Sequence, residues 1–539
     1  MSEFSRRDFV QFLTGAGVMA TKIAALSSMF PMSSCASFKK INKLPFKSLG
    51  PIESDNLETV AGLNYNIMIR WGDVINSKGE LYGFNNDYTA SVPFNGKMDE
   101  SILWVNHEYL YPHLFHGRDV AIGGPRSRKE IIKEMKALGG SLLKIKKGKD
   151  GLWKVEKRSK YNRRVDGETP MRIVADRKIA GRRLAIGTHG NCAGGVTPWG
   201  SFLTCEEGYM IFFTERDRKG KVLQKADFNW EQHISHPSEH YGWVVEVEPL
   251  TGKAKKLTGL GRFSHECATC IRDKKGRTVV YTGDDKAGEH IYKFIAEKND
   301  SLEKGELFVA DIKNGKWVSL DINKQPILKK TFKDQTEVLT FCREAAKLLG
   351  ATPCDRPEDI EINPHNGDVL VTLTNNKRAG NFHGSILKIA EQDDFSGMSF
   401  KASDFLVGGP ETKFACPDNI AFDRNGNLWL CSDISGSDMN KKSKPEYLPF
   451  KNNGLFFIPL SGKEAGKVHQ VASAPIDAEF TGISFSPDGK SMFCSVQHPG
   501  EKSKSVKSLR SHWPDGGKSL PKSALVQFYG PVIDELLGS

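Results

Sequence analysis

Acidic, cysteine and histidine side chains stand beside glycine or proline in a series of short motifs along this chain. Carboxylates brought together from several motifs could bind a hard cation such as Ca²⁺, which takes six to eight oxygen ligands. A thiolate among them would be a softer ligand and would favour a transition metal such as iron. The motifs are FNNDY (84–88), NHEY (106–109), GNCAGG (190–195), TCEE (204–207), FSHE (263–266), GDD (283–285), RPED (356–359), PDN (417–419), EFTG (479–482) and QHPGE (497–501).

The elements that position these motifs are predicted to be short antiparallel strands. A turn ending in glycine precedes a β-rich run at Gly276, Gly367, Gly426 and Gly489, and the last three glycines are about 60 residues apart. Asn-Gly and Asp-Gly between apolar runs are typical of hairpins. We therefore predict an all-β protein with the architecture of a β-propeller, with a pair of β-sandwiches as the alternative. A propeller would place one carboxylate per blade around a central channel.

Helical spacing is confined to a few segments. The stretches 127–138 and 335–349 have it, and we interpret both as insertions that decorate the propeller. The run Val526–Tyr529 is predicted to close the last blade.

Composition narrows the class of protein. The chain has 539 residues, 39 % of them hydrophobic, and a net charge of +11. These values suit a globular protein rather than a disordered one. The chain lacks zinc-finger spacing, heptads and a long basic helix, so we expect small anionic partners and no nucleic acid.

The N-terminus has the pattern of an export signal. Arg6 and Arg7 precede a small apolar stretch, as in a twin-arginine signal, a route that carries folded proteins. Cys35 follows Met32-Ser33-Ser34 in a weak lipobox, so either a lipid anchor on Cys35 or plain cleavage nearby would end the signal. We predict a signal peptide at 1–35, a single propeller domain at 36–539, and a periplasmic or extracellular location.

The ten cysteines do not form a disulfide framework in this reading. Several lie in strand-like runs, where a buried free thiol is common. Cys267 and Cys270 form a C-x-x-C that lacks the second pair of a zinc site. We interpret most cysteines as structural, with Cys192 as the exception.

No single motif identifies an enzyme, because Asn-Asn-Asp and Pro-Asp-Asn are ordinary turn sequences. In order along the chain, however, the motifs resemble the PhoX family of exported alkaline phosphatases. The resemblance runs from Arg70-Trp71-Gly72-Asp73 to Gln497-His498-Pro499-Gly500-Glu501. Its most specific stretches are 191–207, 356–358 and 497–501.

The resemblance implies a six-bladed propeller that holds calcium and iron (Fe³⁺) and hydrolyses phosphomonoesters, releasing inorganic phosphate for phosphate acquisition. It implies that Cys192 binds iron and that Arg356 contacts the phosphate. Glu266, Glu358 and Asp418 match glutamate and aspartate ligands of the family's metal cluster. Further ligands assigned by motif shape alone are Asp87, Glu108, Glu206, Glu207 and Glu479. We expect a monomer acting on small phosphate esters.

Three alternatives remain at this point. A calcium-only propeller hydrolase of the lactonase or phytase type would need the carboxylates but not the thiolate of Cys192. A non-catalytic binding propeller would need neither. A preference for phosphodiesters or phosphotriesters would keep the same metal centre, and the sequence does not distinguish it from monoesterase action.

Overall fold

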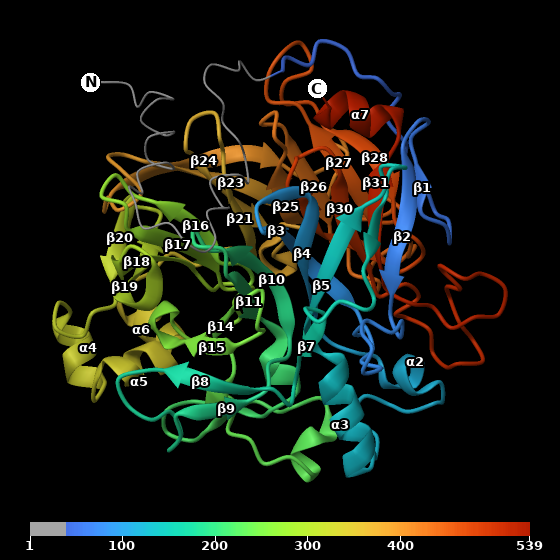
Figure 1. Cartoon of the computed structure of the whole chain (residues 1–539). Coiled ribbons are helices and arrows are strands. Elements are labelled where there is room, and N and C mark those ends of the chain that lie inside the picture. The colour runs from blue at the N-terminus through green and yellow to red at the C-terminus, as the bar shows by residue number, and fades with distance from the viewer. Residues whose placement is uncertain (1–38, 539) are drawn as a thin grey trace.

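The computed structural model describes residues 39–538, and in it six sheets, antiparallel except for the pairing of β15 with β8, surround a common centre (Figure 1). This arrangement is a six-bladed β-propeller and confirms the predicted fold class. The predicted export signal and the predicted lipobox, including Cys35, lie outside the described residues. Among the residues described, no helix is long and apolar enough to cross a membrane.

The first three blades follow one another along the chain. Blade 1 contains β3 (Asn86–Phe94), β4 (Lys97–His107), β5 (Gly139–Lys147), β6 (Trp153–Val155) and β7 (Arg163–Val165). Blade 2 contains β10 (Asn191–Val196), β11 (Phe202–Glu206), β14 (Val244–Val247), β15 (Ala254–Leu257), β8 (Pro170–Val174) and β9 (Leu184–Ile186). Blade 3 contains β16 (Thr269–Arg272), β17 (Thr278–Gly283), β18 (Ile291–Lys298), β19 (Ser301–Asp311) and β20 (Lys316–Ser319).

The last two blades are completed by strands from the N-terminal part of the chain. Blade 4 contains β21 (Pro357–Ile362), β22 (Val369–Leu373), β23 (Ser385–Glu391) and β24 (Phe400–Val407). Blade 5 contains β25 (Pro417–Phe422), β26 (Leu428–Ser432), β27 (Gly454–Ile458), β28 (His469–Ser473) and β1 (Glu58–Thr59). Blade 6 contains β29 (Glu479–Phe485), β30 (Met492–Gln497), β31 (Ala524–Tyr529) and β2 (Asn64–Arg70).

Ring closure therefore uses two strands. β1 pairs with β28 and β2 pairs with β31, both antiparallel. The predicted closing run becomes β31, the third strand of blade 6, and β2 forms the outer edge beyond it. Because strands near both ends of the described residues are hydrogen-bonded into the last blades, the ring has no open seam there.

The predicted hairpin glycines adopt the conformation that the turns require. Gly276, Gly367, Gly426 and Gly489 have φ of 80°, 80°, 73° and 65°. A side chain is disfavoured in this left-handed region, so glycine is the residue that lets each short hairpin close.

Helices decorate the propeller. The region predicted helical at 127–138 contains α3 (Arg128–Ala137), whose Ser127 and Glu130 form a reciprocal capping box. The region predicted at 335–349 is divided at Phe341 into α5 (Gln335–Thr340) and α6 (Cys342–Leu348). The other helices of residues 39–538 are α2 (Pro112–His116), α4 (Pro326–Thr331), α7 (Pro531–Leu537) and the 3₁₀ turns η1 (Gly208–Ile211), η2 (Asn229–Gln232), η3 (Ser238–His240), η4 (Thr258–Leu260) and η5 (Lys377–Ala379). A small ribbon joins β12 (Glu215–Arg216) and β13 (Val222–Gln224).

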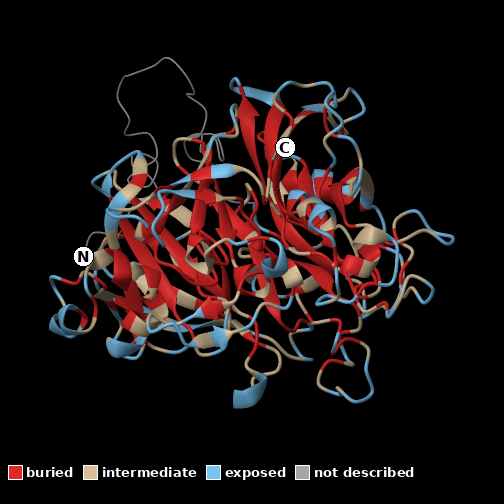
Figure 2. Cartoon of the chain, turned by 90° about the horizontal axis from the view of Figure 1, so that it is seen from below, coloured by how far each residue is buried: buried red, intermediate tan, exposed pale blue. Residues whose placement is uncertain are grey.

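Apolar packing between neighbouring blades forms the core. Val279 and Tyr281 of blade 3, for example, are fully buried in one cluster with Ile360 and Val371 of blade 4. Figure 2 shows the strands buried and the exposed residues concentrated in the connecting segments. The blades thus bury their faces against each other, and the polar motifs remain at the ends of the innermost strands.

Candidate metal centre

Each blade brings two strand ends to the same end of the central channel: the start of its innermost strand and the end of the next strand. In blade 1, Asn86 of β3 pairs with His107 of β4, and the residues that follow them are Asp87 and Glu108. The equivalent pairs are Asn191↔Glu206, His265↔Asp284, Pro357↔Leu373, Pro417↔Ser432 and Glu479↔Gln497. The same pairing recurs in all six blades, so the motifs meet at one end of the central channel.

Bulges lie beside these positions. The register shifts between Asn86 and Thr89 in β3, between Asn191 and Gly194 in β10, and between Pro417 and Ile420 in β25. Similar shifts occur in β21 and β29. A bulge interrupts the regular alternation of side chains and changes where they point. Because of the bulges, the candidate metal ligands at or next to them do not follow the regular alternation of side chains in a strand.

The glycines after Cys192 allow the innermost strands to approach closely. A Cβ atom on Gly195 would lie 2.0 Å from the carbonyl oxygen of Ala268 in the next blade. The Gly194 carbonyl accepts a hydrogen bond from the Ala268 N–H at 2.9 Å. The motif around Cys192 therefore joins blades 2 and 3 at the level of the site.

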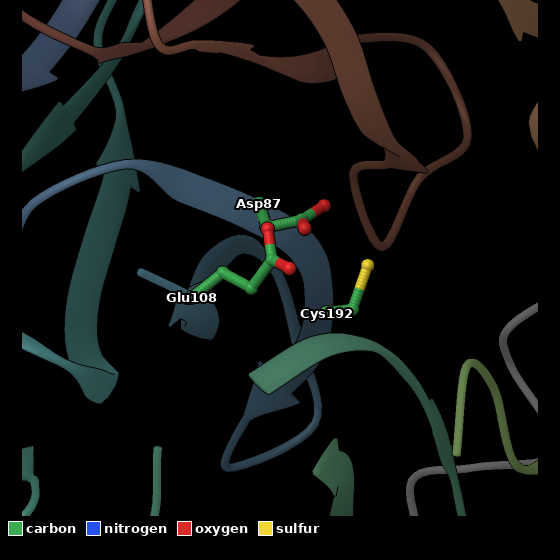
Figure 3. Close-up of side chains that lie close together, drawn as sticks. All are labelled: Asp87, Glu108 and Cys192. Atoms are coloured by element: carbon green, nitrogen blue, oxygen red, sulfur yellow. The ribbon is translucent and has the colours of Figure 1, made fainter. Parts of the chain in front are cut away.

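Two clusters of side chains have the spacing of metal ligands. Ligand atoms of Asp87, Glu108 and Cys192 lie within 4.8 Å of one another, and so do those of Glu266, Glu358 and Asp418. In Figure 3 the carboxylates of Asp87 and Glu108 lie side by side, near the thiol of Cys192. The structure thus brings together six of the predicted ligands, from five blades.

A contact between Cys192 and Glu266 joins the two clusters. The Cys192 Sγ donates to Glu266 Oε1 at 3.0 Å. The second cluster is buried and the first is partly so: Asp87 and Glu266 are each 1 % exposed and Glu358 is 3 % exposed, whereas Glu108 is 9 % exposed and Cys192 is of intermediate burial. They therefore form one continuous acidic centre.

Burial and mutual repulsion raise the pKa of these acids in the metal-free chain. The pKa of Asp87 rises to about 7 and that of Glu108 to about 8, mainly by desolvation. Burial, and then the charge of Glu358, place the pKa of Glu266 well above its usual value. The pKa of the Cys192 thiol is also raised by burial and by the Asp87 carboxylate. These groups stay ionised together only if cations offset their charge.

Two carboxylate oxygens of the centre have no hydrogen-bond partner. Asp87 Oδ1 and Glu479 Oε2 are buried without a hydrogen bond in the described chain. A buried polar atom left without a partner is costly, and such atoms in native proteins usually bind water or an ion. The unpartnered oxygens therefore fit a metal cluster.

Blade 4 supplies a cation instead of a second acid. Arg356 precedes Glu358, and its Nε and Nη2 donate to the two carboxylate oxygens of Asp285 at 2.9 and 2.8 Å. Its Nη2 also lies 2.7 Å from Glu358 Oε1. Arg356 has φ of 57°, a backbone conformation uncommon for a non-glycine residue. The strained backbone and both acids hold the guanidinium beside the clusters.

Blade 6 contributes a carboxylate and an imidazole. Glu479 Oε1 lies 2.9 Å from His498 Nε2, and His498 Nδ1 lies 2.9 Å from the Asp477 carbonyl oxygen. A carbonyl only accepts, so Nδ1 carries a proton there. The Gln497 side-chain amide donates to Glu108 Oε2 at 2.9 Å and so links blade 6 to blade 1. His498 thus orients Glu479, as expected for a histidine beside a ligand.

The adjacent acids Glu206 and Glu207 have different surroundings. Burial, and then the charges of Asp285 and Glu108, raise the pKa of Glu207, which places its carboxylate near the acidic centre. Glu206 instead pairs with Lys256 Nζ at 2.5 Å, and its other oxygen accepts from the Trp243 N–H at 3.1 Å. The structure does not bring Glu206 to the other predicted ligands.

Two acids of the centre were not selected from the sequence. Asp285 lies in the GDD motif, but the motif did not show which of its two acids faces the channel. Asp433 directly follows β26 and interacts with Glu479, whose pKa its charge raises after the effect of burial. The position of Asp433 in its blade could have indicated its role. Asp433 directly follows Ser432, which pairs with Pro417, just as Glu108 directly follows His107, which pairs with Asn86.

The cysteines with described positions are all free. Cys267 is fully buried beside the inner strands, and its Sγ donates to the Glu358 carbonyl at 3.5 Å. Cys270 donates to the Ala268 carbonyl at 3.7 Å. The C-x-x-C pair therefore contacts backbone carbonyls.

Comparison with known proteins gives one family. A profile of the alkaline phosphatase PhoX family matches residues 44–500. The structure of Pseudomonas fluorescens PhoX in complex with vanadate, a transition state analogue, has a TM-score of 0.81 and 29 % sequence identity over 90 % of this chain and 98 % of that one. A gluconolactonase from Xanthomonas campestris matches with a TM-score of 0.36 and 11 % identity over 92 % of this chain and 100 % of the other. No curated protein matches in the sequence comparison.

Proposed function

Because this chain belongs to the PhoX family of alkaline phosphatases, it is a phosphomonoesterase, and we propose that its acidic centre holds calcium and iron. Family membership favours this activity over the lactonase-type, phytase-type and non-catalytic alternatives. The observation that carries the proposal is the convergence of buried carboxylates and one thiol, from all six blades, on the end of the channel.

The donors suit two kinds of cation. The Cys192 thiol, beside Asp87 and Glu266, would hold iron, because a thiolate prefers a softer ion than calcium does. The remaining carboxylates offer the many oxygens that calcium requires. The proposed ligands are Asp87, Glu108, Cys192, Glu207, Glu266, Glu358, Asp418 and Glu479, to which the structure adds Asp285 and Asp433 as acids of the same centre.

Bound cations would supply Lewis acidity, which neutralises the phosphate ester and polarises its P–O bonds. Arg356 would then act on the substrate directly. Its guanidinium is held by Asp285 and Glu358, and two further N–H groups, on Nη1, are not used in either contact. We assign to these N–H groups charge-assisted hydrogen bonds to phosphate oxygens. Holding the guanidinium in advance removes the cost of ordering it in the transition state.

The proposal extends to where the protein works. The paired arginines at Arg6-Arg7 support export of the folded chain, after its metals are loaded, to the periplasm or beyond. Cys35 is the residue that would carry a lipid anchor. Mass spectrometry of the mature N-terminus would distinguish a lipid-modified Cys35 from plain cleavage, and sedimentation would test the proposed monomer.

Hydrolysis of p-nitrophenyl phosphate tests the proposed function. We expect activity at alkaline pH that is lost with a calcium chelator and restored by Ca²⁺. Iron should be present in the active protein and absent from Cys192→Ala, together with its activity. Full iron occupancy in Cys192→Ala would refute the assignment of Cys192, and an active protein free of iron would favour a calcium-only centre.

A further inference from the structure

The helical insertion between blades 3 and 4 sends one side chain toward the acidic centre. Helices α4, α5 and α6 lie together in Figure 1, between the last strand of blade 3 and the first of blade 4 in the chain. Arg343, the second residue of α6, is only 19 % exposed in its side chain. Its guanidinium reaches the strand ends from which Glu266 and Asp285 project.

Arg343 forms hydrogen bonds with residues at both of these strand ends. Its Nε and Nη2 donate to the two oxygens of Asp284 at 2.8 and 2.5 Å. Nη2 also donates to the Ser264 hydroxyl at 3.0 Å. Asp284 is fully buried and directly precedes Asp285, and Ser264 lies two residues before Glu266. A single planar guanidinium thus joins the end of β17 to the segment before β16, which a point charge could not do with the same geometry.

Two connections lead from Arg343 to Asp285. One is the chain itself, through Asp284. The other is the Ser264 carbonyl, which accepts a hydrogen bond from the Asp285 N–H at 3.0 Å. Asp285 in turn holds Arg356 by two hydrogen bonds. The orientation of Arg356 therefore depends on a position that Arg343 fixes from outside the blade.

Arg343 also contacts the neighbouring blade. Its Nη1 lies 3.7 Å from the sulfur of Met210, in the 3₁₀ turn η1 that follows Glu207. The guanidinium is consequently enclosed on two sides, and its pKa is raised well above its usual value by Asp284 despite the opposing effect of burial.

We propose that Arg343 is a positioning residue for phosphate recognition, acting through Ser264, Asp284 and Asp285 on the guanidinium of Arg356. The proposal rests on the proposed role of Arg356 at the phosphate. Without Arg343, the Asp284 carboxylate loses its partner and the end of β17 is free to shift. A displacement of Asp285 would misalign Arg356, and misalignment of this size weakens binding of the phosphoryl group.

Arg218 provides the matched control. Its Nε donates to Glu344 of α6, the helix that carries Arg343, at 2.9 Å. Its Nη1 donates to the Thr331 carbonyl, at the end of α4, at 3.0 Å. Arg218→Ala therefore loosens the insertion without touching Asp284 or Ser264. A role that is merely structural would give Arg343→Ala and Arg218→Ala the same phenotype.

The test compares KM for p-nitrophenyl phosphate, Ki for inorganic phosphate, kcat and metal content in the purified holoenzymes. In Arg343→Ala we expect KM and Ki to rise about tenfold, which equals the loss of one charge-assisted hydrogen bond, with metal content unchanged. Arg218→Ala should keep both constants. Added guanidinium ion should lower KM in Arg343→Ala only. Equal constants in the two variants would overturn the proposal.

The double variant Arg343→Ala/Arg356→Ala separates this inference from the proposed function. If Arg343 acts through Arg356, the double variant should have the KM and Ki of Arg356→Ala alone. Additive effects would overturn the positioning role. If Arg356→Ala itself leaves KM and Ki unchanged, the proposed role of Arg356 is wrong. If Arg356→Ala raises them and Arg343→Ala does not, this inference alone is wrong.

Arg343→Lys tests the proposal even if the alanine variant fails to fold. Lysine keeps the charge on α6 but cannot form the bidentate contact with Asp284 together with the contact to Ser264. We expect a folded enzyme with KM and Ki raised in the same direction by a smaller factor. Wild-type constants in Arg343→Lys would contradict the need for a guanidinium.

Discussion

The two ends of a single strand pair in blade 5 use buried acids in opposite ways. At the hairpin between β25 and β26, Asp423 is 1 % exposed, and its carboxylate accepts from the N–H groups of Asn425 and Asn427 at 2.9 Å and from Trp429 Nε1 at 3.0 Å. At the channel end, Asp418 is 5 % exposed and faces other acids, and burial followed by Glu358 raises its pKa well above the usual value.

Burial alone therefore does not distinguish a structural acid from a functional one. Asp273 at the hairpin of blade 3 is likewise fully buried and accepts from the N–H groups of Lys275 and Arg277 at 2.9 and 2.8 Å. The difference lies in the partners: hairpin acids are satisfied by donors of their own turn, whereas channel acids crowd together and require a cation.

The strongest test of this contrast removes one channel acid. We expect Glu266→Gln to lower kcat/KM at least about a hundredfold, because a neutral amide replaces a carboxylate that belongs to one cluster and contacts Cys192 of the other. The fold should persist, since Glu266 holds no element of the propeller together. Activity assays together with metal analysis and circular dichroism check this. Full activity with intact metal content would place Glu266 outside the functional set.

The neighbours Glu206 and Glu207 sharpen the contrast within two residues. Glu206→Gln leaves Lys256 charged, buried and unpaired, which should lower the free energy of unfolding by about 3–5 kcal/mol. Glu207→Gln should lower activity and spare stability. Urea unfolding and kcat/KM per folded molecule measure the two effects. The reverse assignment of phenotypes would show that Glu206 is the ligand.

Because the acids at the channel end are crowded, removal of the metal should make the stability of the protein depend on pH. In the metal-free chain the pKa values of Asp87, Glu108 and Glu358 rise from 3.8 or 4.5 to about 7, 8 and 7. The folded state then binds more protons than the unfolded state between about pH 4 and pH 8, so stability falls as pH rises through this range.

We expect the Tm of the metal-free protein to decrease from pH 5 to pH 9, and Ca²⁺ to restore most stability at the alkaline end. Differential scanning calorimetry with and without Ca²⁺ measures both trends. A metal-free Tm that rises with pH across this window would show that the channel acids are not crowded in the absence of metal.

The smallest effect is expected at the hairpin end. In Asp423→Asn, an amide group would face the N–H groups from which the Asp423 carboxylate now accepts. The amide offers them either a donor or a weaker acceptor, so the free energy of unfolding should fall by about 1–3 kcal/mol. Metal content and kcat/KM should stay at the wild-type level. Denaturant midpoints and activity assays separate the two. Loss of metal in Asp423→Asn would mean that the two ends of the strand pair are coupled.

The sequence predicted much of this site because its signals are local. The hairpin glycines gave the strand repeat, and the family motifs identified Cys192, Glu266, Glu358 and Asp418, which the structure brings together. Asp433 was missed because Ser-Asp after a strand resembles an ordinary turn. The distinction between Glu206 and Glu207 was also missed, since the two acids are adjacent at the end of β11 and only tertiary packing shows which one meets Lys256.

The sequence by itself determined the strand–turn repeat, the family and the types of ligand, because these follow from residue identity and short spacing. Tertiary structure decided which acids converge, which oxygens lack partners, and that Arg343 reaches Asp284 from a helix 59 residues further along the chain. Bulges and the closure of the ring set those relations. Both depend on contacts between blades that are distant in sequence, and no local pattern of residues encodes such distances.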